Sequence, residues 1–164
     1  KVTCDNGIVV DYIHAGGKIG VLIAAETDNT GAEVVECLKN VAMQIAALHP
    51  QYVCDSEVPE EFKEHEIEII KAQIANDPKA AGKPEKVIEG MINGRINKEM
   101  KEICLLDQVY VQDSDLTVAK YVEKVAKENG ANMTVKRFVR FETGEGLEKK
   151  NEDFAAEVAA QMGN

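Results

Sequence analysis

Two strands are encoded by Ile8-Val-Val-Asp-Tyr-Ile-His-Ala-Gly-Gly-Lys-Ile-Gly-Val-Leu-Ile-Ala-Ala25, around which the rest of this 164-residue chain is organised. The first half alternates with period two, as a half-buried strand does. The residues that share one face of that strand are Ile8, Val10, Tyr12 and His14. A turn is expected at Ala15-Gly-Gly-Lys18, because glycines punctuate regular structure. The continuous apolar run Ile19–Ala25 is typical of a buried central strand.

A helix is predicted next, from Gly31 to Leu48. Its apolar residues recur with the 4-3-4-3 spacing of one helical face. They are Val34, Leu38, Val41, Ile45 and Leu48. Thr30 is the candidate N-cap, and Pro50 ends the run.

Another helix and a third strand are predicted near the C-terminus. The helix spans Asp115 to Asn129, with Asp115 as its N-cap and Gly130 at its stop. Its core-facing residues are Val118, Val122 and Val125. The strand alternates through Met133, Val135, Val139 and Phe141. Arg137 interrupts that pattern, and the strand is expected to return beside the first two.

The middle of the chain predicts a helical hairpin. Helices over Pro59–Asn76 and Pro84–Ile103 each carry a proline where a first turn tolerates one, and Asp77–Lys83 is a cluster of helix breakers. Narrow apolar stripes run along both helices, through Phe62, Ile67, Ile70 and Ile74 and through Ile88, Ile92, Ile96 and Ile103. Such a hairpin buries little by itself, so its leftover apolar surface needs the main body or a second copy.

These elements predict an α+β fold. We expect a three-stranded antiparallel sheet covered by helices, a protruding antiparallel helical hairpin and a C-terminal docking helix. The expected domains are an α+β core of residues 1–57 and 104–150, a hairpin insertion of residues 58–103 and a C-terminal helical module of residues 151–164.

The C-terminal segment is typical of a docking tail. The strand ends in the turn Gly144-Glu-Gly146, and Asn151 is a candidate N-cap for a short helix. Acids in its first turn suit the helix dipole, and its apolar edge is narrow. These acids are Glu152 and Asp153, and the edge is formed by Phe154, Val158 and Met162.

Composition excludes several classes of protein. The net charge of -10 argues against a surface for nucleic acid or anionic membrane, which needs clustered Lys and Arg. The four cysteines form no C-x-x-C pair, so structural, reduced thiols are expected. No run is long enough to span a bilayer and no signal peptide is seen, so we expect a cytoplasmic protein. The start at Lys1 suggests a piece of a longer protein.

No catalytic constellation is present in the sequence. His14, His49 and His65 are isolated, without the second ligand that a metal site requires. His14 is either a satisfied structural residue or a contact on an interaction face. Glu142 and Glu145 fit a solvated turn much better than an acid/base pair. We therefore predict an interaction protein rather than an enzyme, with no cofactor and no metal.

Three blocks of sequence resemble the C-terminal half of elongation factor Ts, the nucleotide exchange factor of elongation factor Tu. They are Asp11–Ala25 (DYIHAGGKIGVLIAA), Gly82–Lys98 (GKPEKVIEGMINGRINK) followed by Leu105–Gln108 (LLDQ), and Arg137–Gln161 (RFVRFETGEGLEKKNEDFAAEVAAQ). Together they cover much of the chain in the family's order.

The resemblance implies a function. The family binds elongation factor Tu and accelerates GDP release by stabilising the nucleotide-free state. The strand with the family's Tyr-X-His-X-Gly motif faces the partner's third domain, and the C-terminal helix packs on its nucleotide-binding domain. The residues that match these contacts are Tyr12, His14, Gly16, Glu152, Asp153, Phe154, Glu157 and Val158. Phe154 has an alternative role, packing on its own domain.

The middle block resembles the family's dimerization hairpin, which implies a homodimer. The hairpin residues expected to take part are Phe62, Ile70, Ile74, Ile88, Ile92 and Ile96. The family also uses a Thr-Asp-Phe-Val motif, from the half that precedes this one, against the partner's magnesium site. Here Asn29 follows Thr27-Asp28, so an Asx-type turn before a helix is expected instead.

We therefore expect the C-terminal core half of an elongation factor Ts, which docks weakly on elongation factor Tu and exchanges nucleotide poorly by itself. The alternative is a self-associating structural domain without exchange activity.

Overall fold

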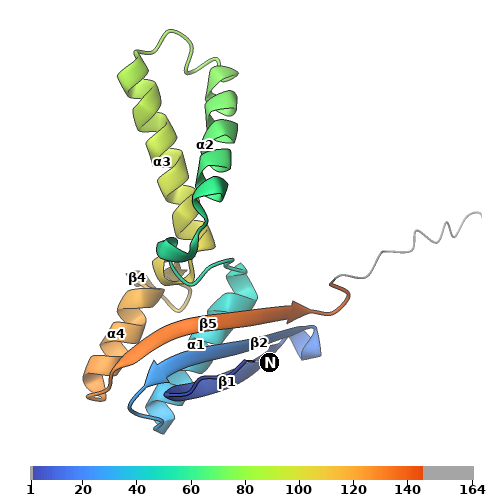
Figure 1. Cartoon of the computed structure of the whole chain (residues 1–164), viewed down its shortest axis with the longest axis vertical. Helices are drawn as coiled ribbons and strands as arrows, with labels where there is room; N and C mark the ends of the chain where they lie inside the picture. The colour runs from blue at the N-terminus through green and yellow to red at the C-terminus, as the bar shows by residue number, and fades with distance from the viewer. Residues whose placement is uncertain (1, 146–164) are drawn as a thin grey trace, which may run out of the picture.

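The computed structural model describes residues 2–145. Its main body is a three-stranded sheet backed by helix α1 (Ala32–Leu48). Two long helices, α2 (Glu60–Ala75) and α3 (Glu85–Ile103), rise away from this body as an antiparallel hairpin (Figure 1). The predicted α+β class, the three-stranded antiparallel sheet and the protruding hairpin are confirmed. The helix predicted within residues 151–164 lies outside the described residues.

Strand β2 (Ile19–Thr27) is the middle strand of the sheet, as its apolar run predicts. It pairs antiparallel with β1 (Gly7–His14) on one side and with β5 (Met133–Glu142) on the other. Its side chains toward α1 are buried, and they are Val21, Ile23 and Ala25. The strand thus has hydrogen-bonded neighbours on both edges and a covered face, which explains why it lacks polar residues between Ile19 and Ala25.

A β-bulge in β5 was not predicted. Ala25 pairs with Val135, but Ala24, the residue before it in β2, pairs with Arg137. Lys136 is therefore an extra residue that opposes nothing on β2. Because side chains alternate with period two, one extra residue moves every later side chain of the strand to the opposite face.

The bulge overturns the prediction that Met133, Val135, Val139 and Phe141 share one face. Val135 is buried in the core, whereas Phe141 lies beyond the bulge and is 56% exposed. After the bulge it is Phe138 that packs against the core, opposite Ile23. The apolar residues do alternate along β5, but the bulge at Lys136 turns the residues after it to the opposite face of the sheet.

Helix α1 packs its apolar stripe on the sheet and begins one residue later than expected. Gly31, not Thr30, is its N-cap and makes no side-chain cap. Instead the Asn29 side-chain oxygen accepts a hydrogen bond from the Gly31 N–H at 2.8 Å. The helix ends as predicted before Pro50, with His49 in the left-handed region at φ 48°. The buried residues of the helix include Val34, Leu38, Val41 and Ile45.

Helix α4 (Val118–Glu128) is shorter than predicted, and Asp115 is not its N-cap. The cap is Thr117, whose hydroxyl accepts a hydrogen bond from the Lys120 N–H at 3.3 Å. Asp115 lies instead in strand β4 (Asp113–Thr117), which pairs with the two-residue strand β3 (Val109–Tyr110). This small sheet was missed because its strands are too short to show alternation.

The hairpin has a core of its own. Pro59 and Pro84 are the N-caps of α2 and α3, as their first-turn positions suggest. The buried residues of this second cluster are Val58, Ile70, Ile74, Ala80, Ile96, Met100 and Cys104. The rings of Tyr52 and Phe62 meet edge to face at its base, with centroids 6.2 Å apart.

A buried polar network fastens the base of the hairpin to α1. The Gln44 amide nitrogen donates to the Val109 carbonyl at 2.9 Å and to the Gln108 side-chain oxygen at 3.2 Å. The Gln44 oxygen accepts from the Val111 N–H at 2.9 Å. Gln108 in turn donates to the Glu102 carbonyl, in the last turn of α3, at 2.7 Å. Both side chains are buried out of reach of water, so these hydrogen bonds give their polar atoms the partners that solvent cannot provide.

Replacing Gln44 with Ala should destabilise the fold. The substitution leaves the Val109 carbonyl and the Val111 N–H without their buried partner, so we expect a loss of about 2–3 kcal/mol in the free energy of unfolding. Urea unfolding followed by circular dichroism measures this loss. Gln73→Ala, at an exposed position of α2, is the matched control and should change stability by less than about 0.5 kcal/mol. Equal stability of the two variants would contradict a structural role for the network.

Candidate partner-binding site at the β1–β2 turn

Tyr12 and His14 lie at the end of β1 and contact each other. The Tyr12 hydroxyl is 3.0 Å from His14 Nδ1, and the two ring centroids are 5.8 Å apart. Tyr12 packs against the main core with its ring, while His14 pairs with Ile19 at the last position of the β1–β2 ladder. Strand pairing and the tyrosine together hold the half-buried imidazole at the rim of the sheet.

The turn that follows has an unusual backbone. Ala15, Gly16 and Gly17 all have positive φ, at 52°, 66° and 94°. A Cβ added to Gly16 would meet no atom within 4 Å, so the backbone and not the space requires glycine there. Ala15 has no such freedom, and the left-handed region costs it about 1 kcal/mol. The exposed turn presents Gly16 directly beside His14, so three of the predicted contact residues are brought together.

Two exposed apolar side chains beside this turn were missed. Ile13 is 68% exposed and Phe141 is 56% exposed. Both pair with Gly20 of β2, one from each side, so they flank a residue without a side chain. A cleft of about 330 Å³ lies between them and the turn. Only the bulge in β5 places Phe141 on this face, and the one sequence signal near it was Arg137, which interrupts the alternation of the strand.

The start of the C-terminal tail is fastened to the same corner. The Thr143 N–H and hydroxyl both donate to the Lys18 carbonyl, at 2.8 and 3.2 Å. Lys18 follows the turn that carries Gly16. The predicted contacts further along lie outside the described residues, and they are Glu152, Asp153, Phe154, Glu157 and Val158.

The apolar stripes of α2 and α3 pack against each other inside the hairpin. Ile70, Ile74 and Ile96 are buried between α2 and α3. The other three residues of the predicted dimerization set pack against the same cluster and are half-buried; they are Phe62, Ile88 and Ile92. The larger apolar side chains exposed on these helices are Ile69, at 37%, and Val87, at 45%.

The remaining histidines and the buried thiols have structural surroundings. His49 caps the C-terminus of α1, and His65 lies exposed on α2. Burial raises the pKa of the Cys37 and Cys104 thiols to about 11, so both stay protonated at neutral pH. Within residues 2–145 no group of three or more His, Cys, Asp or Glu side chains is arranged to hold a metal ion.

The turns at residues 142–145 and 27–29 are held by local hydrogen bonds. Glu142 forms an ion pair with Arg140 at 2.8 Å, and its N–H donates to the Glu145 carboxylate at 3.1 Å. Thr27 accepts a hydrogen bond from the Asn29 N–H through its hydroxyl, which forms the predicted turn before α1. Asp28 instead binds the backbone and side chain of Asn132, and these bonds lower the pKa of the Asp28 carboxyl.

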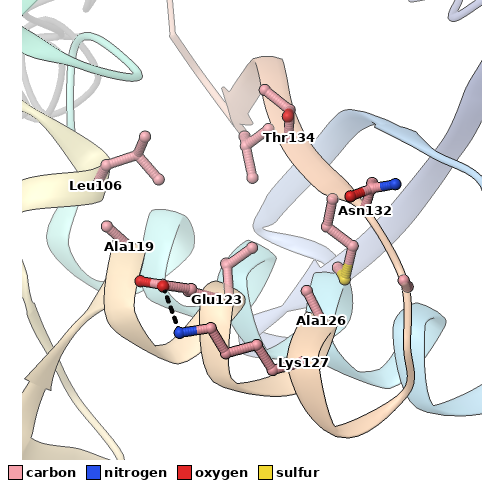
Figure 2. Close-up of a pocket in the computed structure, with 11 residues that line it drawn as sticks. Leu106, Ala119, Glu123, Ala126, Lys127, Asn132 and Thr134 are labelled. Atoms are coloured by element: carbon pink, nitrogen blue, oxygen red, sulfur yellow. Dashed lines mark ion pairs between the residues drawn. The ribbon is translucent and has the colours of Figure 1, made fainter.

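A shallow groove separates α4 from the first residues of β5, away from the His14 turn. Figure 2 shows Ala119, Ala126 and Leu106 around it, with the ion pair between Glu123 and Lys127 along one side. Its volume is about 370 Å³, and the ion pair spans 2.7 Å. None of the predicted contact residues lines this groove.

The described corner thus combines an exposed, strained turn with the Thr143 hydrogen bonds to Lys18. Within those residues no helix is long and apolar enough to cross a membrane. The family model described as "Elongation factor TS" matches residues 1–145. The chain therefore belongs to the elongation factor Ts family.

Named relatives agree with this assignment. An elongation factor Ts of Clostridium botulinum (strain Alaska E43 / Type E3) is 48% identical over 163 residues, which cover 99% of this chain and 52% of the relative. One from Clostridioides difficile (strain 630) is 48% identical over 157 residues, covering 96% of this chain and 50% of the relative. The chain thus spans about half the length of the relatives it matches, and the resemblance inferred from the three sequence blocks is confirmed.

The hairpin should respond to pH through Glu99. Burial, and then the neighbouring Glu66 and Glu102 carboxylates, raise the pKa of the Glu99 carboxyl above its ordinary 4.5. A raised pKa in the folded state means that protonation stabilises the fold below pH 4.5, and that this stability is lost as pH rises through the raised pKa. We expect Glu99→Gln to raise the unfolding temperature at pH 7.

The measurement is thermal unfolding of both proteins from pH 4 to pH 8. The difference between Glu99→Gln and the unmodified chain should be largest at neutral pH and vanish near pH 4. Glu64→Gln, on an exposed position of α2, is the control. A pH-independent difference for Glu99→Gln would show that carboxylate repulsion is not its cause.

Proposed function

We propose that this chain docks on elongation factor Tu and, as part of the whole protein, promotes the release of GDP during translation in the cytoplasm. Membership of the elongation factor Ts family over residues 1–145 carries this proposal. The residues that match the family's partner contacts support it, because Tyr12, His14 and Gly16 lie together at an exposed turn.

The proposed mechanism needs no bond chemistry. A protein that binds the nucleotide-free partner more tightly than the GDP complex weakens GDP binding by the same factor, since linkage between two ligands is reciprocal. The residues required are therefore contact residues. The described corner offers a hydrogen-bonding imidazole, a glycine turn and two apolar side chains, which suits recognition of a protein surface.

The first test of this proposal is a binding experiment. Size-exclusion chromatography with light scattering, with and without nucleotide-free elongation factor Tu, should show a heterocomplex that dissociates on addition of excess GDP. GDP release by the chain alone should be much slower than by a complete factor, because the family's Thr-Asp-Phe-Val contact is not matched at Thr27-Asp28-Asn29. The absence of a heterocomplex, or one indifferent to GDP, would contradict the proposal.

The tail can be tested in the same assay. Phe154→Ala should weaken the heterocomplex about tenfold if its ring enters the partner, since truncation of a buried aromatic anchor costs 1–2 kcal/mol or more. Thermal unfolding of the chain alone tests the alternative, in which Phe154 packs on its own domain. In that case Phe154→Ala would lower the unfolding temperature. Ala155→Gly, next to it in sequence, is a control for changes in the segment itself.

Self-association through the hairpin is a second proposal. It is supported by the exposed apolar side chains of Ile69 and Val87 on α2 and α3. Ile69→Asp and Val87→Asp should therefore abolish a homodimer of twice the 18.0 kDa chain mass while leaving the heterocomplex with elongation factor Tu intact. Ile96→Asp is unsuitable as a test, since that side chain is buried and its replacement would unfold the hairpin.

A further inference from the structure

The bond between Tyr12 and His14 has a consequence for what the imidazole can recognise. The hydroxyl oxygen lies 3.0 Å from Nδ1, so one of the two ring nitrogens is already occupied inside the chain. Among the described residues no group binds Nε2, and the ring is half-buried at the rim of the sheet. Nε2 is the nitrogen left for a partner.

We propose that Tyr12 is a positioning residue: it holds His14 in the tautomer that carries its proton on Nε2, so that this site recognises an acceptor oxygen on the bound protein. The inference rests on the proposed function, since it specifies the chemistry of the same contact. In this role the Tyr12 hydroxyl acts through His14, beside any contact that the tyrosine makes with the partner.

We assign the direction of the hydrogen bond from the donors available within the chain. A phenol has one O–H donor, and within residues 2–145 no other polar group binds the Tyr12 hydroxyl. Donation to Nδ1 therefore satisfies the one proton of the hydroxyl. In a neutral imidazole, one nitrogen accepts and the other donates, so an accepting Nδ1 leaves an N–H on Nε2.

The orientation of the ring is fixed as well as its tautomer. The Tyr12 ring packs against the main core, and its strand position is set by pairing with Val21. His14 is tied to Ile19 in the same ladder and then to the hydroxyl, so its side chain has few other arrangements. A donor held in place before binding loses little entropy when the complex forms.

This arrangement sets a requirement on the partner. An oxygen acceptor, either a carboxylate or a carbonyl, completes the Nε2 hydrogen bond, whereas a lysine or arginine at that point would meet an N–H and leave both donors unpaired. Ile13, the next residue along the strand, points to the opposite face of the sheet and takes no part in this hydrogen bond.

Amide side chains test this assignment because they mimic the two nitrogens separately. The nitrogen of glutamine reaches about as far as Nε2, and that of asparagine about as far as Nδ1. The expected loss of affinity for nucleotide-free elongation factor Tu, by calorimetry, is about tenfold for His14→Asn but only about two- to threefold for His14→Gln, since one hydrogen bond is worth about 1 kcal/mol.

Tyr12→Phe removes the hydroxyl and keeps the ring. It should weaken binding about threefold in the unmodified chain and have no effect in the His14→Gln background, because the glutamine has no tautomer to set. Tyr52→Phe, at the base of the hairpin, is the matched control and should bind as the unmodified chain does. Circular dichroism confirms that each variant is folded.

Nitrogen-15 chemical shifts of His14 in the chain alone give a second readout that needs no partner. The unmodified chain should show a protonated Nε2 and an unprotonated Nδ1, and Tyr12→Phe should shift toward a mixture of tautomers. A protonated Nδ1 in the unmodified chain, equal losses for His14→Asn and His14→Gln, or an unchanged effect of Tyr12→Phe in the glutamine background would each overturn the proposal.

The two proposals fail in different ways. If the unmodified chain does not bind elongation factor Tu at all, the proposed function fails and so does the assignment of an acceptor on that partner, whatever the tautomer. If the chain binds but any of the overturning results above is found, the function stands and only the role assigned to Tyr12 and Nε2 is lost.

Discussion

The packing of α1 against β2 is the contact on which the other elements depend. Leu38, Ile45 and Ile23 are fully buried where the helix meets the central strand. Each such side chain contributes about 1.5–3 kcal/mol through burial. The same helix carries Gln44, which binds the β3–β4 sheet and, through Gln108, the last turn of α3. If α1 did not dock, the sheet would lose its cover and the hairpin its attachment.

The second constraint is the bulge in β5, which sets the residues of this strand that face the core. Because of the extra residue at Lys136, Val135 and Phe138 both face the core although they lie three positions apart in the sequence, and Phe141 lies on the outer face. In Figure 1 that outer face is the one turned away from α1. The candidate site owes its apolar part to this bulge, because Phe141 would otherwise point toward the core and leave Ile13 alone beside Gly20.

The sequence was sufficient for the long, strongly periodic elements and insufficient for the short ones. The run Ile19–Ala25 identified the central strand, and the stripes beyond Pro59 and Pro84 identified the hairpin, because burial imposes those patterns directly. The strands of the small β3–β4 sheet are too short to show a period, so the sequence pattern around Asp115 predicts a helix cap where the structure has a strand. The position of the bulge is set by the register in which β5 pairs with β2, so the sequence of β5 alone does not determine it.

The same distinction applies to the site. Tyr12, His14 and Gly16 could be grouped from sequence because they are neighbours on one strand and turn, and the resemblance to the family gave them a role. The exposed side chains of Ile13 and of Phe141, its neighbour across Gly20, were not predicted. The bond between the Tyr12 hydroxyl and Nδ1 also required coordinates, since two residues on one face of a strand can touch or diverge depending on their rotamers.

The corner and the hairpin are separate surfaces of the described residues. The Thr143 bonds to Lys18 place the origin of the tail beside the His14 turn, so the two contacts proposed for elongation factor Tu would start from one corner. Two contacts joined by a short tether raise each other's effective concentration, which strengthens binding without any new interaction. In the function proposed above, such avidity would be undone stepwise, because a returning nucleotide would need to displace only one of the two contacts before the other dissociates.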